Sequence, residues 1–308
     1  MSETQKGREV ENHKRIFYAN ITYGCNSSCI FCYSHNTKHS KYTYSEVSKD
    51  ALVEYWNKMG VSHKDRIIIN GGEPLLHTEF NDIIEAMREY GCEVLIYTNG
   101  RLLKEIDVSK LTSNCRFVIP IHGHEALHDS ITRVPGSYQE MMAGIVNLSK
   151  SNALVDVKVI INNRMVENQC DYQKTVDSLQ NLPELNAVHI TKMADTIVSK
   201  RNNCPSVTSE MSSRVTSDLF DLFKEKCVVK LFDTCIKEIA MNTTIKVSGI
   251  VPEIQVFFKD AQHEFNVELE KPYLSCMDEC SYKDICQSAV GEYTVLELID
   301  GSFVIGLE

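Results

Sequence analysis

The sequence predicts an α/β fold built around a parallel sheet. Short apolar runs alternate with stretches of helical periodicity along most of the chain, and this alternation implies crossover connections between parallel strands. The run at 66–70 (RIIIN) is almost wholly apolar, as in a strand that is covered on both faces. The helix expected after it repeats apolar residues at the spacing of one buried face, at Phe80, Ile83, Ile84 and Met87.

Six strands are expected along this part of the chain. They cover residues 15–22, 66–70, 93–98, 116–121, 154–161 and 187–192. Pro120 is unfavourable inside the fourth of them, because proline cannot donate to the ladder. Six strand–helix units are too few for a complete eight-stranded barrel, so the alternation leaves an open partial barrel or a doubly wound sheet.

Helix starts and a domain boundary can also be predicted. Two capping boxes are expected, Thr43 with Glu46 for a helix over about 45–59 and Ser137 with Glu140 for one over 137–149. A helix near 208–226 places on one side Met211, Val215, Leu219 and Leu222. Because the pattern changes after about residue 195, we expect a polar arm at 1–14, a core domain at 15–195 and a smaller C-terminal module at 196–308.

The composition narrows the class of protein. A chain of 308 residues with 43% hydrophobic and 24% charged residues is globular. Its net charge of −10 argues against general nucleic-acid binding, which needs clustered Lys and Arg. The first fifteen residues are polar, and no apolar run approaches the length of a membrane span. We therefore expect a cytoplasmic enzyme or binding protein.

Two cysteine triplets stand out among the 12 cysteines. Cys25, Cys29 and Cys32 directly follow the first expected strand, and the second triplet lies near the end of the chain at Cys276, Cys280 and Cys286. Without an export signal these triplets indicate metal sites rather than a disulfide framework. For the first triplet, spacing alone leaves structural zinc open, with His35 as a fourth ligand.

Three motifs resemble those of the radical SAM superfamily. The stretch CNSSCIFCY at 25–33, here named the cysteine loop, is similar to its cluster-binding loop. GGEPLL at 71–76 resembles its GGEP motif, and YTNG at 97–100 its third-strand signature. The resemblance implies a partial (β/α)6 TIM-type barrel with a small C-terminal cysteine-containing module. It also implies a [4Fe-4S] cluster on Cys25, Cys29 and Cys32, whose open iron binds S-adenosyl-L-methionine and whose electron cleaves it to a hydrogen-abstracting 5′-deoxyadenosyl radical.

The resemblance also nominates residues that contact S-adenosylmethionine. They are Gly71, Gly72, Glu73, Pro74, Thr98, Asn99, Tyr33, His122 and Asn162. Glycines allow close backbone approach, and the Glu73 carboxylate would accept from the ammonium group of the ligand. His122 and Asn162 follow the fourth and fifth strands, although each suits a structural role equally well. Arg133 lies in a turn expected to lead into the helix at Ser137, and its side chain could face an anion.

The second triplet resembles a shortened auxiliary-cluster module of the SPASM or twitch type. Fewer cysteines are present than in the full pattern, so an auxiliary [4Fe-4S] cluster would have an open iron or a fourth ligand from Cys235 or Cys227. Structural zinc is the alternative at this triplet.

The resemblance implies a peptide or protein maturase that receives electrons from a donor such as flavodoxin or ferredoxin. A radical SAM enzyme acting on a small molecule such as a nucleotide or sugar, as molybdenum-cofactor cyclases do, is the second hypothesis. A non-catalytic iron–sulfur or zinc protein is the third.

Overall fold

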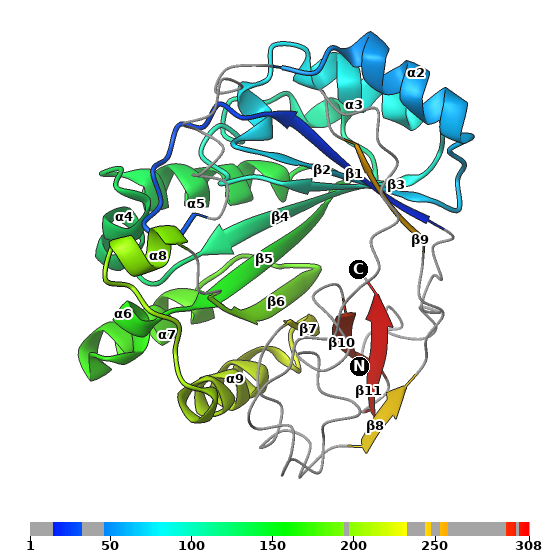
Figure 1. Ribbon diagram of the computed structural model, residues 1–308. Helices are drawn as coiled ribbons and strands as arrows, with labels where there is room; N and C mark the ends of the chain where they lie inside the picture. The colour runs from blue at the N-terminus through cyan, green and yellow to red at the C-terminus, as the bar shows by residue number, and fades with distance from the viewer. Residues whose placement is uncertain are drawn as a thin grey trace.

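The computed structural model describes residues 15–32, 46–193, 197–232, 244–247, 253–257, 294–299 and 302–307. Seven parallel strands follow one another across the sheet in chain order (Figure 1). They are β1 (Arg15–Thr22), β2 (Arg66–Gly71), β3 (Glu93–Tyr97), β4 (Cys115–Ile121), β5 (Leu154–Ile161), β6 (Ala187–Lys192) and β7 (Val228–Phe232). All six predicted strands are confirmed, and β7 extends the series.

Four further strands complete the described sheet. β9 (Glu253–Phe257) pairs parallel with β1 at one edge. At the other edge β10 (Thr294–Ile299) pairs antiparallel with β7, and β11 (Ser302–Leu307) and β8 (Thr244–Val247) follow it. The sheet thus continues past residue 195, and the division into a core domain and a C-terminal module stays a prediction.

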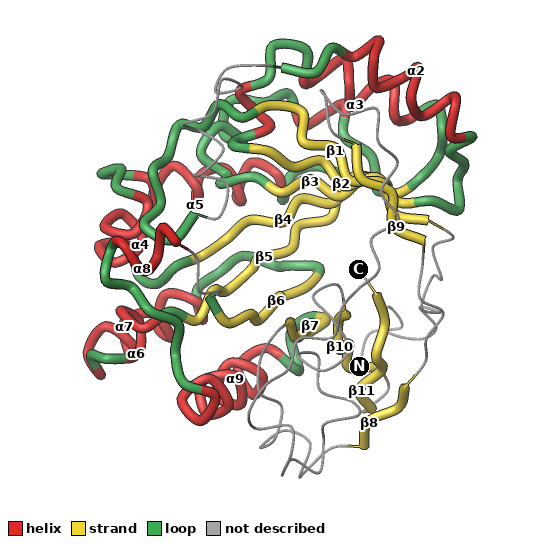
Figure 2. The backbone as a smooth tube through the Cα atoms, in the orientation of Figure 1, coloured by secondary structure: helices red, strands yellow, loops and turns green. Residues whose placement is uncertain are grey.

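The helices lie along the outer side of the curved sheet, as Figure 2 shows. They are α2 (Lys49–Met59), α3 (Phe80–Arg88), α4 (Glu125–Thr132), α5 (Ser137–Leu148), α6 (Asn163–Val166), α7 (Gln169–Gln180), α8 (Ile197–Arg201) and α9 (Ser209–Phe223). The α3 face is buried as predicted. With its crossover helices outside a curved parallel sheet, the chain forms the expected partial TIM-type barrel.

Two layers of side chains fill the sheet's faces. The larger apolar core lies between strands and helices, while Ile16, Ile68, Leu95 and Val118 form a smaller cluster on the opposite face of the sheet. A chain of polar contacts crosses five neighbouring strands near their amino ends. Ion pairs join Arg66, Glu93, Arg116 and Asp156, and a 2.8 Å hydrogen bond joins Asp156 to His189. Structural side chains thus occupy the amino ends of these strands, whereas the motif loops follow their carboxyl ends.

Pro120 lies within β4 without disrupting the sheet. The Val118 carbonyl accepts from the backbone N–H of Thr98 at 3.2 Å, so this edge of β4 faces β3. Pro120 faces the same way two residues later, beyond the last residue that pairs with β3. The N–H that proline lacks is therefore not needed by the ladder.

Both predicted capping boxes are wrong. The N-cap of α2 is Ser48, whose Oγ accepts from the Ala51 N–H at 3.3 Å. Glu46 instead accepts from Thr78 Oγ1 at 2.6 Å, and Thr43 lies outside the described residues. At α5 the N-cap is Gly136, which has no side chain to accept a bond.

The helix predicted near 208–226 is confirmed as α9, although it ends earlier than expected. Thr208 caps its start by accepting from the Met211 N–H. Over the part of the chain that the structure describes, no helix has the length and apolar character required to cross a membrane.

Candidate functional site

The cysteine loop leaves β1 at the carboxyl end of the sheet, where the loops after β2 and β3 also emerge. Cys25, Cys29 and Cys32 are partly exposed. Because parallel strands end at the same edge, the motifs meet there as the sequence predicts. Tyr33 and His35 lie outside the described residues, as do Cys235 and the second triplet.

The loop after β2 is hydrogen-bonded to the end of β1 and the residues that lead into the cysteine loop. The Gly72 N–H donates to the Thr22 carbonyl at 2.8 Å, and the Glu73 N–H donates to the Gly24 carbonyl at 2.7 Å. Gly71 has φ of +146°, and a Cβ there would lie 2.2 Å from the Thr22 oxygen. A Cβ at Gly72 would lie equally close to the Gly24 oxygen. Both glycines are thus required for close approach to the β1 exit.

Glu73 joins the second and third loops inside the protein. Its side chain is completely buried. Oε1 accepts from Thr98 Oγ1 at 2.6 Å and from the Leu75 N–H at 3.1 Å, while Oε2 accepts from the Asn99 N–H at 2.7 Å. Burial raises the pKa of this carboxyl, and the three donors oppose that shift by favouring the charged form. Glu73 therefore has a structural role that the sequence did not reveal.

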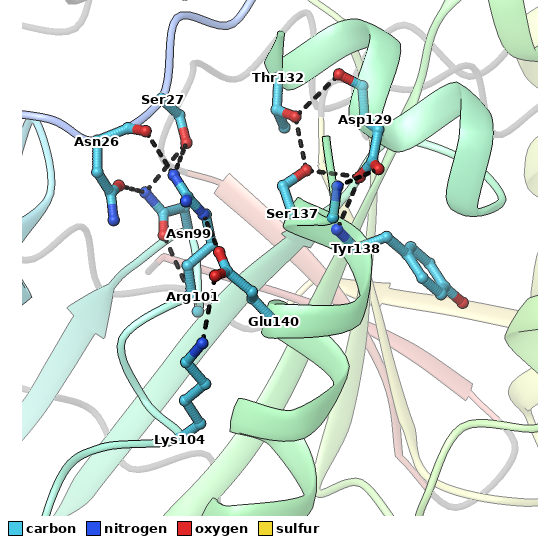
Figure 3. A network of polar contacts seen from close by, with 12 residues as sticks. Asn26, Ser27, Asn99, Arg101, Lys104, Asp129, Thr132, Ser137, Tyr138 and Glu140 are labelled. Atoms are coloured by element: carbon cyan, nitrogen blue, oxygen red, sulfur yellow. Dashed lines mark hydrogen bonds and ion pairs between the residues drawn. The ribbon is translucent and has the colours of Figure 1, made fainter. Parts of the chain in front are cut away.

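The third loop reaches the cysteine loop through Asn99 and Arg101 (Figure 3). Asn99 Nδ2 donates to Asn26 Oδ1 at 2.6 Å. Arg101 Nη1 donates to the Asn26 carbonyl oxygen and, at 3.5 Å, to Ser27 Oγ. Arg101 was not nominated from the sequence, although its place directly after the TNG signature puts it at a strand end, where functional residues gather.

The other side of the cysteine loop docks on the end of α4. Its Ser28 and Ile30 N–H groups donate at 3.0 Å to the carbonyls of Thr132 and Ile131. Asn202 Nδ2 also donates to the Ile30 carbonyl, at 2.8 Å. Hydrogen bonds from the loop after β3 on one side, and with the end of α4 and Asn202 on the other, thus hold the cysteine loop.

Arg133 contacts this assembly, and whether its side chain also faces an anion stays a prediction. It adopts the left-handed conformation with φ of 59° at the end of α4, and its Nη2 donates to Asn202 Oδ1.

Asp129 fixes the corner between α4 and α5. Its Oδ1 accepts from the Tyr138 N–H and from Ser137 Oγ, both at 2.8 Å, and Oδ2 accepts from the Gly136 N–H at 2.6 Å. A carboxylate eight residues before Ser137 therefore caps α5, which confirms the predicted turn into that helix. These bonds also lower the pKa of Asp129 against the opposing effect of burial.

His122 and Asn162 directly follow β4 and β5, and both are buried. The His122 ring stacks on His128 with centroids 5.0 Å apart and meets the Phe31 ring edge-on, also at 5.0 Å. Asn162 caps α6 through the Met165 N–H and donates to the His122 carbonyl at 2.9 Å. Asn162 thus ties the exits of β4 and β5 together, and contact of either residue with a ligand stays a prediction.

The scattered cysteines differ from the first triplet. Cys92, Cys115 and Cys204 are buried, and burial raises the pKa of each thiol, that of Cys92 to about 12. Burial also raises the pKa of Cys227, just before β7, to about 12, and its role as an auxiliary ligand stays a prediction. Cys92, Cys115 and Cys204 are thus enclosed in the core, unlike the partly exposed triplet.

The donor set suits an iron–sulfur cluster. Over the described ranges, no three His, Cys, Asp or Glu side chains converge closely enough for a single metal ion. Thiolates around a cubane bind separate irons, so they need not converge on one point. Three accessible soft thiols on a loop held by backbone hydrogen bonds therefore fit a cluster better than a lone hard cation.

Comparison with known proteins gives a family and several relatives. Residues 19–179 match the radical SAM superfamily. The AdoMet-dependent heme synthase of Methanosarcina barkeri is 26% identical over 229 residues, which are 73% of this chain and 63% of that protein. The sporulation killing factor maturation protein SkfB of Bacillus subtilis is 28% identical over 144 residues, 46% of this chain and 34% of that protein.

The chain spans less than two thirds of the length of either relative. The crystal structure of Streptococcus suis SuiB bound to S-adenosylmethionine shares the fold, with a TM-score of 0.57 and 9% identity over 90% of this chain and 71% of that one. Because the family match extends over more than half of the sequence and includes the loops that follow β1 to β5, the protein belongs to the radical SAM superfamily.

Proposed function

We propose that this protein is a radical enzyme whose reaction begins at Cys25, Cys29 and Cys32. A [4Fe-4S] cluster with one open iron would supply the electron that cleaves S-adenosylmethionine to methionine and a 5′-deoxyadenosyl radical, which takes hydrogen from the substrate. The observation that carries this proposal is that the GGEP loop is hydrogen-bonded to the chain directly before the cysteine loop, and the TNG loop to Asn26 within it.

The chain's own residues would hold the cofactors in place. The three cysteines would bind three irons as thiolates, and the loops after β2 and β3 would line the S-adenosylmethionine site. For its contacts we propose residues from four strand ends and the cysteine loop, namely Gly71, Gly72, Glu73, Pro74, Thr98, Asn99, Tyr33, His122 and Asn162. Because the oxygens of Glu73 already accept three internal bonds, its main contribution would be to fix the position of Thr98 and Asn99.

Metal analysis with a matched cysteine pair tests this proposal. Cys29→Ser should remove about four irons per chain relative to the parent protein prepared anaerobically. Cys170→Ser, which changes an exposed cysteine on α7, should keep them. With a strong reductant, the parent and Cys170→Ser should form 5′-deoxyadenosine and Cys29→Ser should not. Zinc without iron in the parent would overturn the proposal.

For the substrate we propose a peptide or protein. SkfB is named as a maturation protein, and a structure of SuiB, with a TM-score of 0.51, was solved with the precursor peptide SuiA. The test is the mass of a precursor peptide encoded beside this enzyme, after incubation with S-adenosylmethionine and a donor such as flavodoxin or ferredoxin. An unchanged mass while 5′-deoxyadenosine forms would contradict a peptide substrate.

A small-molecule substrate is the second candidate, favoured by the relative named as a heme synthase. Its test is a substrate-dependent change in the spectrum of a second cluster.

We also propose an auxiliary [4Fe-4S] cluster on Cys276, Cys280 and Cys286, with Cys235 as fourth ligand. Cys276→Ala should lower the iron content from about eight to about four per chain. Loss of one zinc with unchanged iron would instead make this triplet a structural zinc site.

A further inference from the structure

Arg101 touches both the cysteine loop and the helix that supports it. Its Nη1 donates to the carbonyl oxygen of Asn26, the residue between Cys25 and the rest of the loop, and its Nε donates at 2.6 Å to Glu140 Oε2. Figure 3 shows the guanidinium lying between Asn26 and Ser27 on one side and Glu140 on the other. Its planar fork allows one side chain to make both contacts at once.

Glu140 lies on α5, which packs closely against the TNG loop. Gly144 follows it by one helical turn on the same face of α5, and a Cβ at Gly144 would lie 2.3 Å from the Gly100 carbonyl oxygen. Helix α5 is therefore in direct backbone contact with the TNG loop, just before Arg101. The hydrogen bond from Arg101 lowers the pKa of Glu140, and Lys104 contributes in the same direction.

Lys104 provides an internal comparison for Arg101. Its Nζ binds the other oxygen of the same carboxylate, Glu140 Oε1, at 3.2 Å. Of these two cations, Arg101 is the one that also donates to Asn26 and Ser27. The two cations thus share one anionic partner and differ in whether they reach the cysteine loop.

We propose that Arg101, braced by Glu140 of α5, is a positioning residue that holds the Asn26–Ser27 part of the cysteine loop ready for its cluster. This inference rests on the proposed function, because it assumes that the loop binds iron. The guanidinium gives the Asn26 carbonyl a charged donor, and it places a positive charge beside a loop that must carry three thiolates. Without Arg101, this part of the loop loses its charged donor and keeps its bonds to Asn99, so it should open more often and release iron faster.

The first test needs no cofactor. In the metal-free protein, amide hydrogen exchange is measured for peptides that cover residues 24–32 in the parent, Arg101→Met and Lys104→Met. Arg101→Met should speed exchange in this segment about tenfold, whereas Lys104→Met should stay within about twofold of the parent. Equal exchange in the two variants would overturn the proposal.

The second test uses the loaded protein. Iron release into a chelator is timed for the same proteins after anaerobic reconstitution, and Arg101→Met should lose iron about tenfold faster than Lys104→Met. If Arg101→Met does not fold, Arg101→Lys replaces it, since one ammonium group cannot reach Glu140 and Asn26 as the fork does. Arg101→Lys should then lose iron faster than Lys104→Met, and equal rates would refute the role of Arg101.

The outcomes separate this inference from the proposed function. A parent protein that binds no iron, or a Cys29→Ser variant that keeps all of it, would defeat the function itself. A parent that binds iron normally, with Arg101→Met indistinguishable from Lys104→Met, would defeat only the role of Arg101.

Discussion

Thr98 Oγ1 donates a 2.6 Å hydrogen bond to Oε1 of Glu73, and this bond joins the loops that follow the second and third strands. Thr98 is itself buried, so water cannot replace the bond if it is lost. Through Asn99, the next residue, the same loop contacts Asn26 of the cysteine loop. Three motifs that are far apart in the sequence thus form one hydrogen-bonded unit.

Glu73→Gln should destabilise the protein. An amide nitrogen would face one of the donors that now bind the carboxylate, and a buried donor left without an acceptor costs about 1–3 kcal/mol. Urea unfolding should therefore show a loss of about 2 kcal/mol. Glu105→Gln, at an exposed glutamate on the loop after β3, should change stability by less than about 0.5 kcal/mol. Similar stabilities for the two variants would refute the structural role of Glu73.

Asp129→Ala should lower stability by about 2 kcal/mol, because it removes the acceptor for Gly136, Ser137 and Tyr138 at the start of α5. The matched variant is Asp107→Ala. Asp107 also caps a turn, accepting from the Ser109 N–H at 3.1 Å, but it is exposed to water. We expect about 0.5 kcal/mol or less there. Urea unfolding measures both variants. An equal loss of stability would show that the hydrogen bonds of Asp129 stabilise the protein no more than those of exposed Asp107.

Gly144→Ala should destabilise α5 even though alanine is the better helix former. The gain in helix propensity is about 1 kcal/mol. The new methyl would meet the Gly100 backbone oxygen at 2.3 Å, and overpacking against a backbone that cannot move costs typically about 1–3 kcal/mol. We expect a lower thermal midpoint than for Val146→Ala, which changes an exposed residue of the same helix. A raised midpoint for Gly144→Ala would contradict the close packing.

The metal-free protein should lose stability as the pH falls from about 6.5 to about 4. Burial lowers the pKa of His128 from 6.5 to about 4, and burial together with His128 lowers the pKa of His122 as well. In this window the unfolded chain binds protons that the folded chain does not, so acid favours unfolding. The loss from His128 should be on the order of 3 kcal/mol.

His128→Gln checks the source of this pH dependence. The slope of unfolding free energy against pH should become shallower between pH 6.5 and pH 4, whatever the variant's absolute stability. A steep slope in His128→Gln would show that other groups are responsible.

The strands and the motif loops could be predicted because their signals are local. A buried parallel strand is apolar along its own length, as at 66–70, and the GGEP and TNG residues occupy positions directly after such runs. The capping boxes failed although their signal is local too. Asp129 folds back from the preceding helix to cap α5, so Glu140 is left to bind Arg101.

The sequence by itself determined where the first six strands lie along the chain, the position of the cysteine loop at the first strand end and the family resemblance. These depend on periodicity and on the fact that parallel strands end at one edge. Only the tertiary structure decided what holds that loop. Glu73, Arg101 and Asp129 act through partners between 7 and 75 residues away. Such pairings depend on how the loops and helices pack in three dimensions, which spacing along the chain does not encode.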